Sequence, residues 1–188
     1  MSKIESGKLT LTTEQISLKE VVEGIVNIMQ PQVKAKRQTF DIHVENILTE
    51  NIWCDGVRLN QVLLNLYRIQ QSIHRRGAIQ LSLSEEKSPK GENYIRIHVK
   101  VKDNGIGMSS DFLKRIYEPY SRADGVRVSK TQGTGLGMAI TKYIVDAMEG
   151  SLNITSELDK GTEVSLTFDF EKAVEQEMDM FFLPGICW

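Results

Sequence analysis

The chain has 188 residues and a formal net charge of −2, which fits one globular domain with short appendages and gives no overall charge that would favour nucleic acid or an anionic membrane. Its two cysteines lack metal-type spacing and are too few for a disulfide framework, so a reducing compartment is expected. The sequence has no apolar run of transmembrane length and no signal-peptide pattern.

The N-terminal part of the chain predicts one long helix. Residues 1–8 are typical of a helix that runs into a glycine stop. Ser17-Leu-Lys-Glu20 forms a capping box, and apolar residues follow it at helical spacing. Because proline lacks the N–H of the helix ladder, Pro31 is expected to kink or end this helix.

Two strands and a second helix are predicted next. Apolar and polar residues alternate from 40 to 44, and residues 51–54 predict a second, short strand. Asp55 is expected to cap the helix that follows. The apolar face of that helix comprises Leu59, Val62, Leu63, Leu66 and Ile69.

A pair of alternating strands is predicted around residues 79–83 and 95–101, with a polar turn at 88–93 between them. The second of these strands ends at Asp103. Ser109 or Ser110 is expected to cap a short helix over the residues that follow, 111–117.

Residues 122–131 are polar and lack an apolar period, so they predict a mobile loop. Gly137 opens a predicted helix through Met148, with Gly150 as its C-cap.

A final hairpin is predicted from alternating residues around 152–154 and 164–170, with a turn at 159–161. The whole order of elements predicts helices on one face of a mixed, mostly antiparallel sheet. The predicted fold class is therefore α/β, as a two-layer α/β sandwich.

The segment Asp103-Asn-Gly-Ile-Gly-Met108 places a carboxylate before a glycine turn at a strand end. A carboxylate accepts a hydrogen bond from an exocyclic amine, so Asp103 can select adenine over guanine. Gly105 and Gly107 let the backbone approach a flat base or a phosphate closely. In isolation the motif also fits a plain turn with the aspartate as its cap.

A second glycine motif, Gln132-Gly-Thr-Gly-Leu-Gly-Met138, opens the predicted helix at Gly137. Unpaired N–H groups and the helix dipole favour phosphate at such an N-terminus. A glycine-rich turn into a helix is common, so this motif alone is weak evidence. Both motifs together, with a polar loop between them, indicate a purine nucleotide site.

Further segments join these two motifs in one known pattern. The matches are residues 55–65 with the approach to an Asn box, residues 103–108 with a first glycine box, Ile116-Tyr-Glu-Pro-Tyr120 with a Phe box, residues 132–140 with a second glycine box, and Gly161-Thr-Glu-Val164 with a Gly-Thr pair. The chain thus resembles the catalytic ATP-binding domain of sensor histidine kinases, in the gyrase/Hsp90/histidine kinase/MutL (GHKL) superfamily. Residues 1–8 resemble the segment that joins the dimerisation helices to that domain.

The resemblance implies a Bergerat-type ATP-binding fold and a set of site residues. Around the base it implies Asp103, on the adenine amine, with Gly105, Gly107 and Thr162. Beside the phosphates it implies Gly133, Gly135 and Gly137.

The resemblance also makes residues 122–131 an ATP lid. Arg122, Arg127 or Lys130 would then reach the γ-phosphate. Solvated loop charges explain these three basic residues equally well.

The Asn box of the family is altered in this chain. The family pattern has a second Asn that carries Mg²⁺ and a Lys that supports the phosphates, whereas this chain keeps Asn65 but has Ile69 and Ser72 at those two positions. An isoleucine offers no oxygen to Mg²⁺, which requires oxygen ligands in octahedral geometry. Phosphoryl transfer depends on that ion. ATP is therefore expected to bind and transfer to be weakened, with Asn65 as the candidate metal and catalytic residue.

Two explanations of the altered box stay open. One is drift to a non-catalytic nucleotide domain. The other is a pair of compensating frameshifts, because Tyr67 to Arg76 can be encoded so that another frame gives Ser-Asn-Ser-Thr-Lys-His-Thr-Pro-Gln. The DNA sequence of this stretch distinguishes the two.

The first functional expectation is the catalytic domain of a two-component sensor histidine kinase, which uses ATP and Mg²⁺ to phosphorylate a histidine outside this chain. The alternative is a nucleotide-binding pseudokinase, which Ile69 and Ser72 favour. A gyrase-type or chaperone-type ATPase is a third possibility, and the Phe box argues against it. The three histidines are expected to be structural.

The expected domains are the end of a dimerisation helix with a linker (1–11), the catalytic ATP-binding domain (12–172) and a C-terminal tail without an assigned role (173–188). The expected partners are the protein's own dimerisation and histidine-phosphotransfer domain, in a homodimer, and the receiver domain of a response regulator, with no nucleic acid. The expected location is the cytoplasmic side of a membrane-anchored bacterial receptor.

Overall fold

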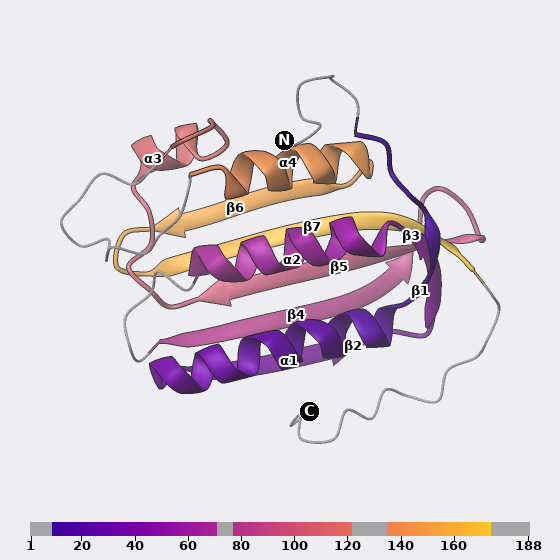
Figure 1. Ribbon diagram of the computed structural model, residues 1–188, viewed down its shortest axis with the longest axis horizontal. Coiled ribbons are helices and arrows are strands. Elements are labelled where there is room, and N and C mark those ends of the chain that lie inside the picture. The colour runs from indigo at the N-terminus through magenta and orange to yellow at the C-terminus, as the bar shows by residue number, and fades with distance from the viewer. Residues whose placement is uncertain (1–8, 71–76, 122–134, 174–188) are drawn as a thin grey trace.

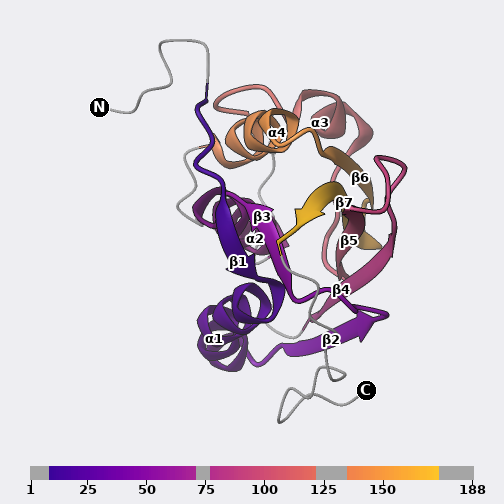
Figure 2. The same ribbon diagram turned by 90° about the vertical axis from the view of Figure 1, so that its right-hand side faces the viewer.

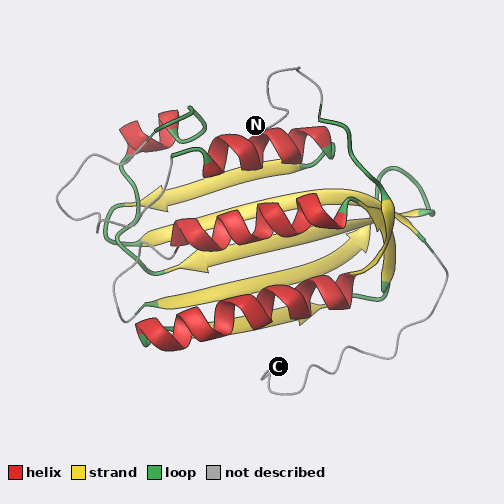
Figure 3. Ribbon diagram, in the orientation of Figure 1, coloured by secondary structure: helices red, strands yellow, loops and turns green. Residues whose placement is uncertain are grey.

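The computed structural model describes residues 9–70, 77–121 and 135–173. These residues form two layers, a seven-stranded sheet and a set of helices over one of its faces (Figures 1 and 3). The predicted two-layer α/β sandwich is confirmed. The elements in chain order are β1 (Glu14–Ser17), α1 (Leu18–Lys36), β2 (Thr39–Glu45), β3 (Asn51–Cys54), α2 (Gly56–Gln70), β4 (Ala78–Lys87), β5 (Tyr94–Asp103), α3 (Ser110–Arg115), α4 (Gly137–Ala147), β6 (Ser151–Glu157) and β7 (Gly161–Lys172).

The sheet has the strand order β1-β3-β7-β5-β4-β2, with β6 beside β7. β2 and β4 pair in parallel, and the other pairs of this sheet are antiparallel. One edge of β7 pairs with β5, and its other edge pairs first with β6 and then with β3. β7 therefore joins one part of the sheet, β1 and β3, to the other part, β5, β4 and β2.

The three long helices lie side by side over the sheet, with α2 between α1 and α4, and Figure 2 shows the two layers from the side. Alternate residues of β5 point toward the helices: Ile95, Ile97, Val99 and Val101 are each at most 3% exposed. The residues between them, such as Arg96 and Lys100, line the face without helices. This alternation is typical of an antiparallel sheet with one solvated face.

The structure tests two helix boundaries that the sequence predicted. The Ser17 hydroxyl accepts a hydrogen bond from the Glu20 N–H at 3.2 Å, as the capping box predicted. The helix does not end at Pro31, because α1 continues to Lys36. Met29 and Val33, on either side of the proline, are 2% and 5% exposed. Packing on the sheet therefore holds the helix although one ladder hydrogen bond is missing.

The start of α2 is as predicted. The Asp55 carboxylate accepts the Arg58 N–H at 3.0 Å and, through its other oxygen, the Thr12 N–H at 3.0 Å. Leu59, Val62, Leu63 and Leu66 are buried on the inner face of the helix.

The end of α4 differs from the prediction. The left-handed residue is Glu149, with φ 56°, and the Gly150 N–H donates to the Val145 carbonyl at 2.9 Å. Gly150 is required for packing instead, because a Cβ at this position would lie 2.5 Å from the Phe168 ring.

Strand β1 was not predicted from the sequence. The predicted loop at 122–131 and the helix end at 1–8 lie outside the described residues. Within the described ranges, no helix is both long and apolar enough to cross a bilayer.

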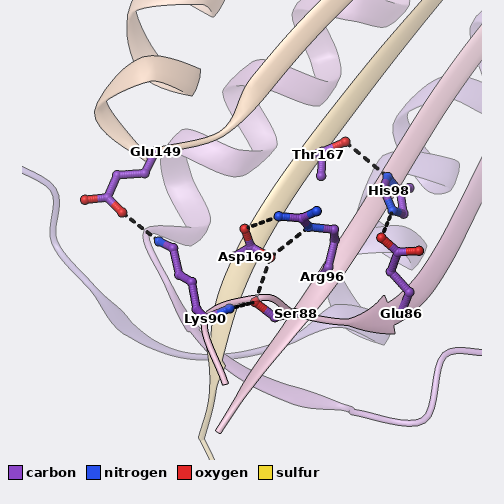
Figure 4. A network of polar contacts seen from close by, with 8 residues as sticks. All are labelled: Glu86, Ser88, Lys90, Arg96, His98, Glu149, Thr167 and Asp169. Atoms are coloured by element: carbon purple, nitrogen blue, oxygen red, sulfur yellow. Dashed lines mark hydrogen bonds and ion pairs between the residues drawn. The ribbon is translucent and has the colours of Figure 1, made fainter. Parts of the chain in front are cut away.

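A polar network joins the right-hand end of the sheet in Figure 1 to the end of α4, and Figure 4 shows it from close by. Arg96 donates from Nε and Nη2 to the two oxygens of Asp169, at 2.9 Å each, across the β5–β7 pair. The guanidinium holds the pKa of Asp169 below its usual value. Ser88 donates to the same carboxylate at 2.8 Å, and Lys90 forms an ion pair with Glu149 at 2.6 Å. These contacts hold the β4–β5 turn in place.

One glycine of the helix layer has no structural requirement. Gly24 lies in the middle of α1 on its exposed side, and a Cβ there would meet no atom of the described residues within 4 Å. We expect Gly24→Ala to raise the free energy of unfolding by about 0.5–1 kcal/mol, because alanine is the better helix former. Urea unfolding measures the change. A loss of stability would contradict the position of Gly24 within α1.

Candidate functional site

Asp103 is the last residue of β5 and is 5% exposed. This end of β5 lies at the left-hand end of the sheet in Figure 1. Its Oδ1 atom accepts two backbone hydrogen bonds, from Gly105 N–H at 2.8 Å and from Thr162 N–H at 3.1 Å. Within the described part of the chain no donor reaches the second oxygen, Oδ2. The carboxylate is thus held in place through one oxygen and has the other available for a ligand.

Burial raises the pKa of the Asp103 carboxyl from 3.8 to about 6, and the hydrogen bonds from Gly105 and Thr162 oppose part of this rise. A buried carboxylate with one unpaired oxygen is costly without a partner, and it gains most from a ligand that donates a hydrogen bond to it. Strongly shifted titratable groups of this kind are concentrated at functional sites.

Hydrogen bonds connect the first glycine loop to the turn between β6 and β7. The Asp159 N–H donates to the Ile106 carbonyl at 2.8 Å, and the Met108 N–H donates to the Ser156 hydroxyl at 2.8 Å. Together with the bond from Thr162 to Asp103, these contacts hold the loop in one position against the hairpin.

Two glycines make this close approach possible. Gly107 has φ 62°, and a Cβ there would lie 1.9 Å from the Glu157 carbonyl oxygen. Gly161 has φ 98°, and a Cβ there would lie 2.1 Å from the Asp103 carbonyl oxygen. Only glycine fits either position, because both the backbone conformation and the contact exclude a side chain.

Two residues of the site were missed in the sequence. Ser156 contacts the first glycine loop, and Asn104 accepts the Ala78 N–H at 2.8 Å through Oδ1, which fixes the start of the loop to β4. The hairpin predicted from the sequence could have identified Ser156, because the register of its two strands places this residue directly across from Thr162.

The second glycine turn leads into α4. Leu136, at the N-cap, gives α4 no side-chain cap, so none of the described residues caps the first N–H groups of the helix, and these groups can bind a ligand. Gly135 has φ 71° and accepts the Tyr120 N–H at 3.0 Å through its carbonyl. A Cβ on Gly135 would lie 2.8 Å from the Tyr120 backbone. Tyr120, the last residue of the Phe-box segment, therefore positions this turn.

Asn65 connects α2 to the first turn of α4. Its Nδ2 atom donates to the Gly137 carbonyl at 3.5 Å and to the Thr141 hydroxyl at 3.3 Å. The amide protons are thereby used within the protein, and Oδ1 is the oxygen that Asn65 can offer to a cation. Among the residues with described positions, no three His, Cys, Asp or Glu side chains converge as a metal site would.

The structure brings together most of the predicted site. Asp103, Gly105, Gly107 and Thr162 lie at the end of β5, and Asn65, Gly135 and Gly137 lie at the start of α4. This end of β5 and this end of α4 are both on the left in Figure 1. An acceptor for a base amine and free helix N–H groups for an anion are thus present at one end of the sheet. The other predicted residues lie outside the described part of the structure. These are the side chain of Ile69 and the whole of Ser72, Arg122, Arg127, Lys130 and Gly133.

Comparison with known families gives a match that spans both glycine motifs. The family model described as "Histidine kinase-, DNA gyrase B-, and HSP90-like ATPase" matches residues 54–172. The chain is 33% identical over 176 residues to the autoinducer 2 sensor kinase/phosphatase LuxQ of Vibrio vulnificus, covering 94% of this chain and 20% of that protein. It is 28% identical over 183 residues to the sensor protein GacS of Pseudomonas syringae pv. syringae, covering 97% and 20%. The chain thus spans about a fifth of the length of these curated relatives.

Solved structures also match most of this chain. The crystal structure of full-length ShkA in complex with AMPPNP matches with a TM-score of 0.70 and 25% identity, over 88% of this chain and 32% of that one. The nucleotide-free catalytic domain of the histidine kinase ThkA matches with a TM-score of 0.67 and 18% identity, over 85% of this chain and 98% of that one. The second match is evidence of the fold alone.

Proposed function

The chain belongs to the family of histidine kinase-, DNA gyrase B- and HSP90-like ATPases, as a histidine kinase catalytic ATP-binding domain, and from this membership we propose that it donates the γ-phosphoryl group of ATP to a histidine outside residues 1–188. The observation that carries the proposal is the Asp103 carboxylate, which is buried and held through one oxygen while the other has no donor among the described residues. The full-length ShkA structure, a similar protein, contains the ATP analogue AMPPNP.

The described residues fit an adenine nucleotide. Asp103 would accept the adenine amine through Oδ2, and the glycine loop would lie against the base, where no side chain fits at Gly107. The uncapped N-terminus of α4 at Gly137 would bind the phosphates, because its N–H groups and dipole favour negative charge. Gly133, Arg122 and Lys130 are proposed on the phosphate side from the sequence alone.

The acceptor histidine is proposed to lie on the protein's own dimerisation and histidine-phosphotransfer domain, in a homodimer. A response regulator receiver domain is the proposed next acceptor, and a membrane-anchored bacterial receptor with this domain on its cytoplasmic side is the proposed setting. The names of two relatives support these proposals, since LuxQ is named a sensor kinase/phosphatase and GacS a sensor protein. The unit proposed to carry the activity is residues 12–172.

Binding of Mg²⁺ distinguishes an active kinase from a pseudokinase. Bound Mg²⁺ would neutralise the charge that develops on the phosphates during transfer. Asn65 would supply one oxygen, and Ile69 supplies none. This isoleucine favours a second candidate function, a pseudokinase that binds nucleotide and transfers little.

Calorimetric titration with ADP and GDP tests the nucleotide site, and ADP is expected to bind at least about tenfold more tightly. Phosphoryl transfer to the dimerisation domain, assayed in the full-length receptor with γ-labelled ATP, tests the kinase step. Tighter binding of GDP would contradict the assigned role of Asp103.

The substitution Ile69→Asn tests the altered Asn box. We expect it to increase the effect of Mg²⁺ on AMPPNP affinity at least about tenfold, because an amide oxygen then reaches the ion. Ile69→Leu is the matched control, since leucine has a similar size and no oxygen. Calorimetry with and without Mg²⁺ measures all three proteins.

Each outcome has a separate meaning. A wild-type chain whose AMPPNP affinity already rises with Mg²⁺ supports the kinase, and one that responds only after Ile69→Asn supports the pseudokinase. If Ile69→Asn leaves the metal dependence unchanged, position 69 does not correspond to the magnesium ligand.

A further inference from the structure

Ser156 has three hydrogen-bond partners at the base end of the candidate site. Its hydroxyl oxygen lies 2.8 Å from the Met108 nitrogen, 2.9 Å from the Gly161 carbonyl oxygen and 2.9 Å from the Thr162 hydroxyl oxygen. The residue is on β6, directly across from Thr162 on β7. It therefore contacts the glycine loop and both residues of the Gly-Thr pair at once.

The direction of each of these hydrogen bonds follows from chemistry. A serine hydroxyl has one proton to donate and two lone pairs to accept with. The Met108 N–H can only donate, so Ser156 accepts from it, and the Gly161 carbonyl can only accept, so Ser156 gives it the one proton. The Thr162 hydroxyl must then donate its proton to the remaining lone pair of Ser156.

The consequence lies at Thr162. With its proton directed to Ser156, the Thr162 hydroxyl offers only lone pairs to anything else nearby. The Thr162 N–H bonds to Asp103 at 3.1 Å, so this hydroxyl belongs to the residue beside the carboxylate. Both side chains at this end of the site then act as acceptors, and Thr162 is only 6% exposed.

We propose that Ser156 is a specificity-determining residue for the nucleotide base, acting through the proton of the Thr162 hydroxyl. This inference rests on the proposed function, since it assigns the nucleotide base to the Asp103 end of the site. At position 6 of the base, an acceptor pairs with the amine of adenine and opposes the oxygen of hypoxanthine or guanine. Ser156 is a positioning residue, because it acts on the base only through Thr162.

The substitution Ser156→Ala tests this role with ADP and IDP, which carry an amine and an oxygen at position 6 of the base. Without the serine lone pair, the Thr162 hydroxyl is free to turn its proton toward the base. The ADP:IDP ratio of association constants is then expected to fall about tenfold, the effect of one mismatched hydrogen bond. Ser156→Thr retains the hydroxyl and is expected to keep the ratio within about twofold of wild type.

Two further variants separate this role from a loss of structure. Ser165→Ala makes the same chemical change on β7, across from Asn153, and is expected to leave the ratio unchanged. In a Thr162→Val background, which has no hydroxyl to orient, Ser156→Ala is expected to change the ratio no further. Thermal unfolding of each variant, with calorimetry of ADP and IDP, completes the measurement.

The outcomes distinguish this inference from the proposed function. If Ser156→Ala weakens ADP and IDP equally, the residue only supports the loop, and the inference is overturned while the nucleotide site stands. If the ratio still falls in the Thr162→Val background, the action does not pass through Thr162, and the inference is overturned. If wild-type protein binds neither nucleotide, both the inference and the proposed function fail.

Discussion

Replacing Asp103 by asparagine is expected to weaken ADP binding by at least about 100-fold without unfolding the protein. The asparagine oxygen can accept the N–H groups of Gly105 and Thr162 that now bond to Oδ1. Its NH₂ group then takes the position of Oδ2 and presents a donor to the donor of adenine. The variant thus keeps the loop in place and inverts the hydrogen-bonding character of the ligand-facing atom.

The same substitution changes how stability depends on pH. Burial raises the pKa of Asp103 from 3.8 to about 6. Below the lower value the carboxyl is protonated in both folded and unfolded states, and as pH rises toward 6 ionisation is less favourable in the folded state. The wild-type free energy of unfolding therefore includes a contribution that is lost between about pH 4 and pH 6. Asp103→Asn lacks this loss, so at pH 8 it is expected to be at least as stable as wild type.

Asp111→Asn is the matched control, because this carboxylate on α3 is 86% exposed. It is expected to change neither ADP affinity nor the pH dependence of thermal unfolding. An Asp103→Asn protein that binds ADP as wild type does would show that Asp103 does not have the proposed contact with the base.

The second large effect is expected for Gly161→Ala. A Cβ at Gly161 would lie 2.1 Å from the carbonyl oxygen of Asp103, and the residue has φ 98°. The first residues of β7 would have to move away from Asp103, which breaks the hydrogen bond from Thr162. We expect a loss of about 2–4 kcal/mol in the free energy of unfolding and at least about 30-fold weaker ADP binding.

Gly91→Ala separates the two causes of this loss. Gly91 has φ 119°, and in the described part of the chain no atom would lie within 4 Å of a Cβ at this position. This control therefore has the backbone strain without the collision. It is expected to lower the free energy of unfolding by about 1–2 kcal/mol and to leave ADP affinity unchanged. Urea unfolding and calorimetry measure both variants. Equal losses of stability in the two variants would show that the contact with Asp103 is unimportant.

Much of the fold could be predicted because its elements have strong local signals. Apolar alternation gave β4 and β5, and helical spacing gave the inner face of α2. Strand β1 has no such signal, since its four residues, Glu14–Ser17, do not alternate and form a strand only by pairing with β3. Pro31 was assigned a local effect on α1 that tertiary packing overrides.

The candidate site shows the same division. Asp103, Gly107 and Gly135 stand in motifs whose spacing is local, and the structure gives each a physical requirement. The role of Ser156 depends on three contacts that form only when the glycine loop and the last hairpin meet. Asn65 was expected at the metal, and the structure adds its amide bonds to α4, which no pattern within α2 could predict.

The central position of β7 in the sheet has a consequence for the order of synthesis. Until β7 leaves the ribosome, β1 and β3 have no hydrogen-bonded connection to β5, β4 and β2. The Thr162 N–H that holds Asp103 is 59 residues downstream of that carboxylate. Pairings of such long sequence separation form late and slowly. The proposed base pocket therefore cannot form before β7 has been synthesised, and a nucleotide would stabilise this domain only after that strand has been added.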